Sequence, residues 1–266
     1  MSASHTTTAN SAWISARYAP VPPHTRIVCL PHAGGGAGVF GCWRPHVPAG
    51  IELAPVDLPG RGARIDEPVA GTFDELLDSL FGALRGEFTM PYAIYGHSFG
   101  ALLGYELTLR IEREIERGEP LLAPVALLVS GSRAPHVPLN REPVTDGDDA
   151  RLVSWLRETG GLPEELLAFP GFLTDLLRAV RSDIAFAEQY LVPGPVPVAC
   201  PVVALAGRED TVSPVADVEP WAAYTSAAHR LCVLPGGHYF PQSHAEATVR
   251  AVMDGLFAVT APRNLS

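Results

Sequence analysis

Short apolar runs alternate with longer segments of helical spacing along most of the chain. Six of these runs have the length and the β-branched content of buried strands. They cover residues 26–30, 51–56, 92–95, 125–130, 201–206 and 230–234. Helical segments lie between them, and one starts at the capping-box pattern from Thr72 to Glu75 and runs to about Phe88. Strands that alternate with helices predict the α/β class, with a mostly parallel central sheet flanked by helices.

The segment from about 133 to 197 breaks this alternation. It has no run typical of a strand, and its spacing predicts helices at 146–158, 163–169 and 172–190. Insertions after central strands lie at the edge of a parallel sheet where ligands bind, so we expect a helical lid. The alternative is a helical insertion that only adds stability. The Pro-rich segment 192–197 then leads back to the sheet.

Length and composition indicate how many domains the chain forms and which classes of binding partner they argue against. The 266 residues are 47% hydrophobic, which suits a single α/β domain spanning 1–266. No apolar segment approaches the roughly 20 residues that cross a bilayer, and residues 1–11 lack the pattern of a signal peptide. We therefore expect a cytoplasmic protein. We also expect a monomer. The net charge of −10 argues against nucleic acid or a membrane as partner, and the four cysteines have no metal-binding spacing.

A Gly-x-Ser-x-Gly motif at 96–100 carries the first chemical signal. It follows a predicted strand and precedes a helix that continues to about Gly118. This is the strand–turn–helix context of a nucleophile elbow, which predicts Ser98 as the nucleophile. Larger residues than Gly96 and Gly100 would collide with the neighbouring strand and helix. Because the motif also occurs by chance, its interpretation depends on whether partner residues exist.

A serine hydroxyl needs a base, and the base needs an orienting carboxylate. Asp210 follows the fifth apolar run, and His238 follows the last one. Their order along the chain after Ser98 is that of α/β-hydrolases. We predict Asp210 as the acid and His238 as the base. Glu209 remains an alternative for the acid, and His244 an alternative for the base.

A glycine-rich loop at 30–38 follows the first predicted strand. It lacks the Gly-Lys-Ser/Thr pattern of phosphate-binding loops and an acidic residue in the expected ribose position. In a serine hydrolase such a loop supplies one N–H group to an oxyanion, and the residue after the nucleophile supplies another. We predict the backbone amides of Ala33 and Phe99 as the oxyanion hole. This chemistry requires no metal and no organic cofactor.

Several of these motifs resemble those of stand-alone type II thioesterases of polyketide and non-ribosomal peptide assembly lines. The matching residues are 30–35, 40, 43, 58–62, 64, 67–68, 96–101, 132–135, 207, 210 and 236–240. The Pro-Gly-Arg-Gly piece at 59–62 and the Arg-Ala-Pro piece at 133–135 separate the chain from esterases that share only the triad. Two residues depart from the family pattern: Phe99, where Met is usual, and Ala63, where Asp is frequent.

The resemblance implies an α/β-hydrolase fold and an editing enzyme. Such enzymes hydrolyse aberrant or stalled acyl groups from the phosphopantetheine arm of acyl or peptidyl carrier domains. Arg64 and Arg133 are candidates for contacting an acidic carrier domain, or for internal structural bonds. Alternatives with the same triad are a product-releasing thioesterase and a small-ester carboxylesterase, and a further one is an inactive carrier-binding module. The chain contains no carrier domain, which favours the free-standing editing type.

Overall fold

Six parallel strands form one central sheet in the computed structural model, which describes residues 12–19, 21–162, 165 and 170–260. The strands are β1 (Thr25–Leu30), β2 (Ile51–Pro55), β3 (Tyr92–His97), β4 (Ala126–Ser130), β5 (Val202–Gly207) and β6 (His229–Leu234). All five neighbouring pairs are parallel. The six strands predicted from the sequence are confirmed, with each end shifted by at most two residues.

The strand order, β2-β1-β3-β4-β5-β6, reverses direction next to β1. The chain passes from β1 to β2 on one side and then returns to place β3 on the other. At such a switch point the loops after the two strands diverge and leave a crevice at the carboxyl edge of the sheet. The glycine-rich loop follows β1 and the turn at Ser98 follows β3, so both lie beside this crevice.

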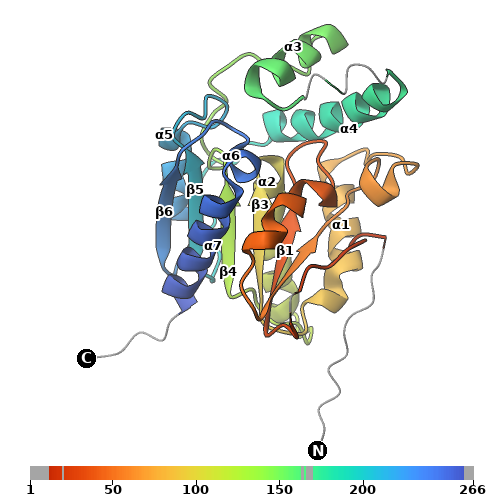
Figure 1. Cartoon of the computed structure of the whole chain (residues 1–266). Coiled ribbons are helices and arrows are strands. Elements are labelled where there is room, and N and C mark those ends of the chain that lie inside the picture. Colours follow the sequence, from red (N-terminus) through yellow and green to blue (C-terminus); the bar gives the residue numbers. More distant parts are fainter. Residues whose placement is uncertain (1–11, 20, 163–164, 166–169, 261–266) are drawn as a thin grey trace, which may run out of the picture.

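Helices cover both faces of the sheet (Figure 1). One face carries α1 (Phe73–Leu84), α2 (Phe99–Glu116), α5 (Val215–Val218) and η5 (Glu219–Tyr224), and the other carries η1 (Ala37–His46), α6 (Phe240–Ser243) and α7 (Ala245–Thr260). The predicted capping box at Thr72 is confirmed, because its hydroxyl and the Glu75 carboxylate bond reciprocally to backbone amides. Short turns η2 (Gly62–Arg64) and η3 (Arg85–Glu87) complete the connections. No helix in the described part of the chain is long and apolar enough to cross a membrane.

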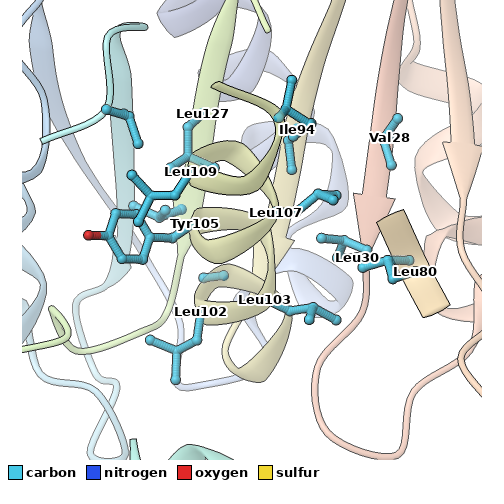
Figure 2. Close-up of a cluster of buried hydrophobic side chains, with 14 of the residues drawn as sticks. Val28, Leu30, Leu80, Ile94, Leu102, Leu103, Tyr105, Leu107, Leu109 and Leu127 are labelled. Atoms are coloured by element: carbon cyan, nitrogen blue, oxygen red, sulfur yellow. The ribbon is translucent and has the colours of Figure 1, made fainter. Parts of the chain in front are cut away.

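The main hydrophobic core lies between α2 and the sheet. Figure 2 shows Leu103 and Leu107 of α2 on the side of the helix that faces Leu30 and Leu80, while Tyr105 lies on the opposite side. Strand side chains alternate between the two faces, so in β3 Ile94 packs against α2 while its neighbour Tyr95 packs on the other face. This packing fixes the first turn of α2 against the carboxyl edge of the sheet.

An insertion between β4 and β5 forms a separate layer above that edge (Figure 1). It contains α3 (Asp149–Thr159) and α4 (Pro170–Gln189), which confirms two of the three predicted helices within a few residues. These helices bury an apolar cluster of their own, formed by Val144, Leu152, Leu156, Leu162, Leu177, Val180 and Ile184. The predicted helix at 163–169 falls outside the described residues except for position 165, and the N-terminal segment 1–11 lies outside them entirely.

A buried ion-pair network lies at the opposite, amino edge of the sheet. Arg26 of β1 and Glu52 of β2 are register partners and pair at 2.6 Å. Arg17 pairs with Glu52 and with Glu87, at 2.8 Å in each case, and Arg26 also pairs with Glu87 at 2.6 Å. None of the four side chains is more than 8% exposed, so each charge depends on its partners rather than on water.

We predict that Glu87→Gln lowers the free energy of unfolding by about 3–5 kcal/mol, because two buried guanidinium groups lose a charged partner. Urea unfolding followed by circular dichroism measures this change. Asp78→Asn is the control, since Asp78 pairs with Arg110 but its side chain is 63% exposed. That substitution should cost less than about 1 kcal/mol. Equal costs for the two substitutions would contradict the prediction.

Candidate active site

Ser98 occupies a strained turn between β3 and α2, which confirms the predicted strand–turn–helix context. Its φ of 53° is positive, the one such value for a non-glycine residue in the described part of the chain. A Cβ at Gly96 would overlap the carbonyl of Gly100, and a Cβ at Gly100 would lie 2.5 Å from the Pro31 carbonyl oxygen. Both obstacles are backbone atoms that cannot move aside. The two glycines therefore permit the tight turn that presents the serine hydroxyl above the sheet.

Two hydrogen bonds join Ser98, His238 and Asp210. The Ser98 Oγ lies 3.0 Å from His238 Nε2, and His238 Nδ1 lies 2.9 Å from Asp210 Oδ2. The second carboxylate oxygen of Asp210 accepts hydrogen bonds from the amides of Val212 and Ser213, at 2.8 and 2.9 Å. These bonds hold the carboxylate in a position where its other oxygen accepts a hydrogen bond from the protonated Nδ1 of His238. His238 Nε2 is thereby left to accept the hydroxyl proton of Ser98.

The two alternatives from the sequence make other contacts. The exposed carboxylate of Glu209 accepts a hydrogen bond from the Gly236 amide at 2.5 Å. The Nδ1 atom of His244 lies 3.0 Å from the Ser243 hydroxyl. In the described part of the chain, Asp210 supplies the carboxylate on His238, and His238 supplies the imidazole on Ser98.

Ala33 and Phe99 line the same cavity as Ser98. Phe99 is the first residue of α2, so its N–H group has no acceptor within the helix. Neither amide donates a hydrogen bond to another residue in the part of the chain that the structure describes. The amino terminus of an 18-residue helix also favours negative charge nearby. The position is suited to stabilising an oxyanion.

The insertion contributes residues to a small cavity at Ser98. Its volume is about 60 Å³, which is room for roughly two water molecules. Residues of the insertion that line the cavity are Arg133, Leu139, Arg141, Trp155, Ile184, Ala187 and Glu188. The floor includes Ser98, Phe99 and Leu102. A ligand that reaches the serine hydroxyl would therefore lie beside residues of both the sheet edge and the insertion.

A model of the thioesterase domain family matches residues 25–256. The chain belongs to this family. Thioesterase PikA5 of Streptomyces venezuelae is 34% identical over 235 residues, covering 86% of this chain and 79% of the relative. The solved structure of BorB, a type II thioesterase from the borrelidin biosynthetic cluster, is 29% identical with a TM-score of 0.79, covering 94% and 99% of the two chains. RedJ, a thioesterase from the prodiginine pathway in Streptomyces coelicolor, is 31% identical with a TM-score of 0.77 and 89% coverage of each chain.

These relatives confirm the predicted resemblance to type II thioesterases and the α/β-hydrolase fold. At the first departure from the family pattern, Phe99 packs its ring against those of Phe73 and Phe186, with centroids 6.2 and 6.3 Å apart. The aromatic ring therefore fills one wall of the cavity while the backbone amide stays available. At the second departure, the Ala63 amide donates to Asp57 Oδ2 at 3.4 Å.

The two arginines that the sequence suggested for partner binding make internal contacts in this thioesterase. Arg133 is buried and donates to the carbonyls of Val137, Ala187 and Tyr190, at 2.5, 2.9 and 2.7 Å. Burial lowers the pKa of its guanidinium from the ordinary value. Arg64 is also buried and lies 3.7 Å over the ring of Trp13. Both side chains therefore hold segments of the fold together.

The sequence analysis missed Asp183, which is 1% exposed and pairs with Arg61. A signal for it was present, because Asp183 follows Leu176 and Val180 at helical spacing and so lies on the apolar face of α4. A carboxylate on such a face must find a buried partner. Arg61 belongs to the Pro-Gly-Arg-Gly piece that had already distinguished this family.

Two further histidines lie near His238. The His97 ring centroid is 5.1 Å from that of His238, and its Nδ1 is 3.0 Å from the Ser130 hydroxyl. Burial, with His238 and His32 nearby, lowers the pKa of His97 well below its ordinary value. Burial also lowers the pKa of His32 to about 4. Both rings are therefore neutral near pH 7.

We predict that the thioesterase loses stability as the pH falls from about 6.5 towards 4. Histidines of the unfolded chain take up protons in this interval, whereas His97 and His32 in the folded protein do not, because their pKa values are lowered. The unfolded state therefore binds more protons, and its free energy falls relative to that of the folded state. Urea unfolding at a series of pH values measures the slope. His97→Asn should make the slope shallower, and an unchanged slope in this variant would contradict the assignment.

Proposed function

We propose that the protein is a serine thioesterase that removes aberrant or stalled short acyl groups from the phosphopantetheine arm of acyl or peptidyl carrier domains. The observation that carries this proposal is the hydrogen-bonded chain from Ser98 through His238 to Asp210 beneath a small, covered cavity. The biosynthetic relatives support the choice of a carrier-bound substrate. The substrate brings its own phosphopantetheine, and the proposed chemistry needs no other cofactor.

In the acylation step, His238 Nε2 takes the proton of Ser98 as its Oγ attacks the thioester carbonyl. The Asp210 carboxylate holds the ring and stabilises the imidazolium that forms. The carbonyl oxygen becomes negative only in the tetrahedral state, where the amides of Ala33 and Phe99 would donate to it. One such donor is worth roughly 3–4 kcal/mol of barrier. The intermediate then collapses, the C–S bond breaks, and His238 returns its proton to the departing thiolate.

In the deacylation step, a water molecule attacks the ester carbonyl of the acyl-enzyme. His238 accepts a proton from this water, and the same two amides would hold the second oxyanion. Collapse breaks the bond to Ser98 Oγ and releases a carboxylic acid. The proton passes from His238 back to the serine oxygen, which restores the starting state.

The small cavity supports a preference for short acyl groups. A volume of about 60 Å³ accommodates a few non-hydrogen atoms, and Trp155 and Ile184 are among the residues that line it. In a hydrophobic site of this kind, one added or missing methylene changes the relative transition-state binding of two substrates by roughly 1–3 kcal/mol. Long chains would have to displace the insertion or leave the cavity unfilled.

We predict that the wild-type protein removes acetyl and propionyl groups from a loaded carrier protein, whereas Ser98→Ala does not. The reason is that no other hydroxyl is hydrogen-bonded to His238 Nε2 in the described part of the chain. Mass spectrometry of carriers loaded with acetyl, propionyl, malonyl and longer groups follows the loss. Thioester hydrolysis by Ser98→Ala would refute the mechanism.

The same experiment separates the alternatives. Release confined to a long, mature chain would indicate a product-releasing thioesterase. Activity on simple esters without loss from any carrier would indicate a general carboxylesterase. Tight carrier binding without turnover by the wild-type protein would indicate a binding module.

We predict that Ile184→Ala raises the ratio of kcat/KM for hexanoyl over acetyl substrates by about tenfold, because the shortened side chain extends the cavity. Hydrolysis of acyl-N-acetylcysteamine thioesters of increasing chain length measures the ratio. A change that is equal for all chain lengths would mean that the cavity does not hold the acyl group.

A further inference from the structure

Ala33 lies between two peptide groups whose orientations are fixed by hydrogen bonds. In the preceding group, the His32 carbonyl accepts from the Gly35 amide at 2.9 Å. In the following group, the Ala33 carbonyl lies 3.0 Å from His32 Nδ1, and the Gly34 amide donates to Asp183 Oδ2 at 2.9 Å. These two peptide groups contain one further polar group, the Ala33 N–H, which has no acceptor among the described residues. Ala33 is one of the residues that line the cavity at Ser98.

The acceptor for Gly34 comes from the insertion, 149 residues away along the chain. The Asp183 carboxylate is 1% exposed and is held by Arg61, whose Nη1 donates to Oδ2 and whose Nη2 donates to Oδ1 at 3.1 Å. Arg61 is anchored in turn, because its Nε and Nη2 both donate to the Pro59 carbonyl, at 3.2 and 3.1 Å. The carboxylate is therefore fixed from one side and presents Oδ2 to the loop.

Helix α4 also shapes the loop by direct contact. Gly34 has a φ of 72°, and a Cβ on it would overlap the side chain of Val180, which lies on α4 three residues before Asp183. The loop thus needs a glycine at this position to approach the helix. Rotation of the Ala33–Gly34 peptide would take a donor from a buried carboxylate, which is costly because no water replaces it.

We propose that Asp183, held by Arg61, is a positioning residue for the oxyanion hole. Its carboxylate fixes the Gly34 peptide group and thereby aims the Ala33 N–H into the cavity. This inference rests on the proposed function, and it gives the insertion a second role. The insertion covers the serine and also sets the geometry of one oxyanion donor, so α4 must be docked on the loop for full activity.

The test compares Asp183→Asn and Asp183→Leu with the wild-type protein on acetyl-N-acetylcysteamine. Removal of an entire oxyanion donor costs about 10²–10³ in kcat, so a misaligned donor should cost roughly tenfold to a hundredfold. We expect this loss in kcat with KM changed less than about twofold, and a larger loss for Leu than for Asn. Folded Asp183→Leu with the kcat of the wild type would overturn the proposal.

Glu87→Gln is the matched control, because it also removes one carboxylate from a buried ion-pair network, at the far edge of the sheet. It should lower stability while leaving kcat of the folded protein unchanged. A fall in kcat equal to that of Asp183→Asn would show that general destabilisation explains both variants.

The double variant Arg61→Leu/Asp183→Leu addresses the case in which single variants fail to fold. It removes both charges, so no unpaired charge stays buried, but the Gly34 amide still lacks its acceptor. The loss in kcat should persist in this variant. A double variant with wild-type kcat would show that the ion pair is only structural and would overturn the proposal.

Binding of a trifluoromethyl ketone analogue of the acetyl thioester separates this inference from the proposed function. The analogue forms a tetrahedral adduct on Ser98, and its affinity should fall in Asp183→Asn by the same factor as kcat/KM. If the wild type hydrolyses acetyl-N-acetylcysteamine but no loaded carrier, the carrier assignment fails while the Asp183 comparison stands. If the wild type hydrolyses neither substrate, binding of the analogue still tests the role of Asp183. Equal affinities for the wild type and Asp183→Asn would then overturn the proposal.

Discussion

The site depends on how closely the first turn of α2 approaches the carboxyl ends of β1 and β3. At Gly100 the helix backbone lies so near the carbonyls of Leu30 and Pro31 that no side chain fits between them. This contact leaves the chain no room for an ordinary turn, and Ser98 takes a φ of 53° to make the connection. One consequence is a hydroxyl raised above the sheet. Another is that the free amide at the start of α2 and the loop after β1 face the same small space.

Much of the arrangement could be predicted because parallel strands end at one edge. Ser98, Asp210 and His238 each follow a strand, so their places in the chain were enough to bring them to the same region. The choice of Asp210 over Glu209 needed the fold of the loop itself. The Asp210 side chain is held in the interior because its Oδ1 accepts hydrogen bonds from the amides of Val212 and Ser213. The Glu209 carboxylate is exposed and accepts a hydrogen bond from the Gly236 amide. Two adjacent carboxylates in a loop do not reveal such a difference from their order alone.

The contact between Asp183 and Gly34 could not be predicted for a different reason. Which residue of an inserted helix meets the sheet depends on how that helix docks, and docking is set by packing over a separation of 149 residues. At the end of α4, Arg133 donates to the carbonyls of Ala187 and Tyr190, and the Tyr190 hydroxyl donates to Glu106 of α2. Helical spacing predicted the helix but gave no information on these attachments, which make it a fixed wall of the cavity.

The packing around Ser98 also affects the charge of the histidines near it. During the proposed reaction His238 carries a transient positive charge that Asp210 stabilises. A second positive charge on His97, 5.1 Å away between ring centroids, would oppose that state by about 3 kcal/mol at an effective dielectric constant near 20. Burial keeps His97 neutral by lowering its pKa. The packing that makes the turn at Ser98 rigid therefore also removes a charge that would compete with the imidazolium, and one tightly packed edge of the sheet serves both geometry and charge.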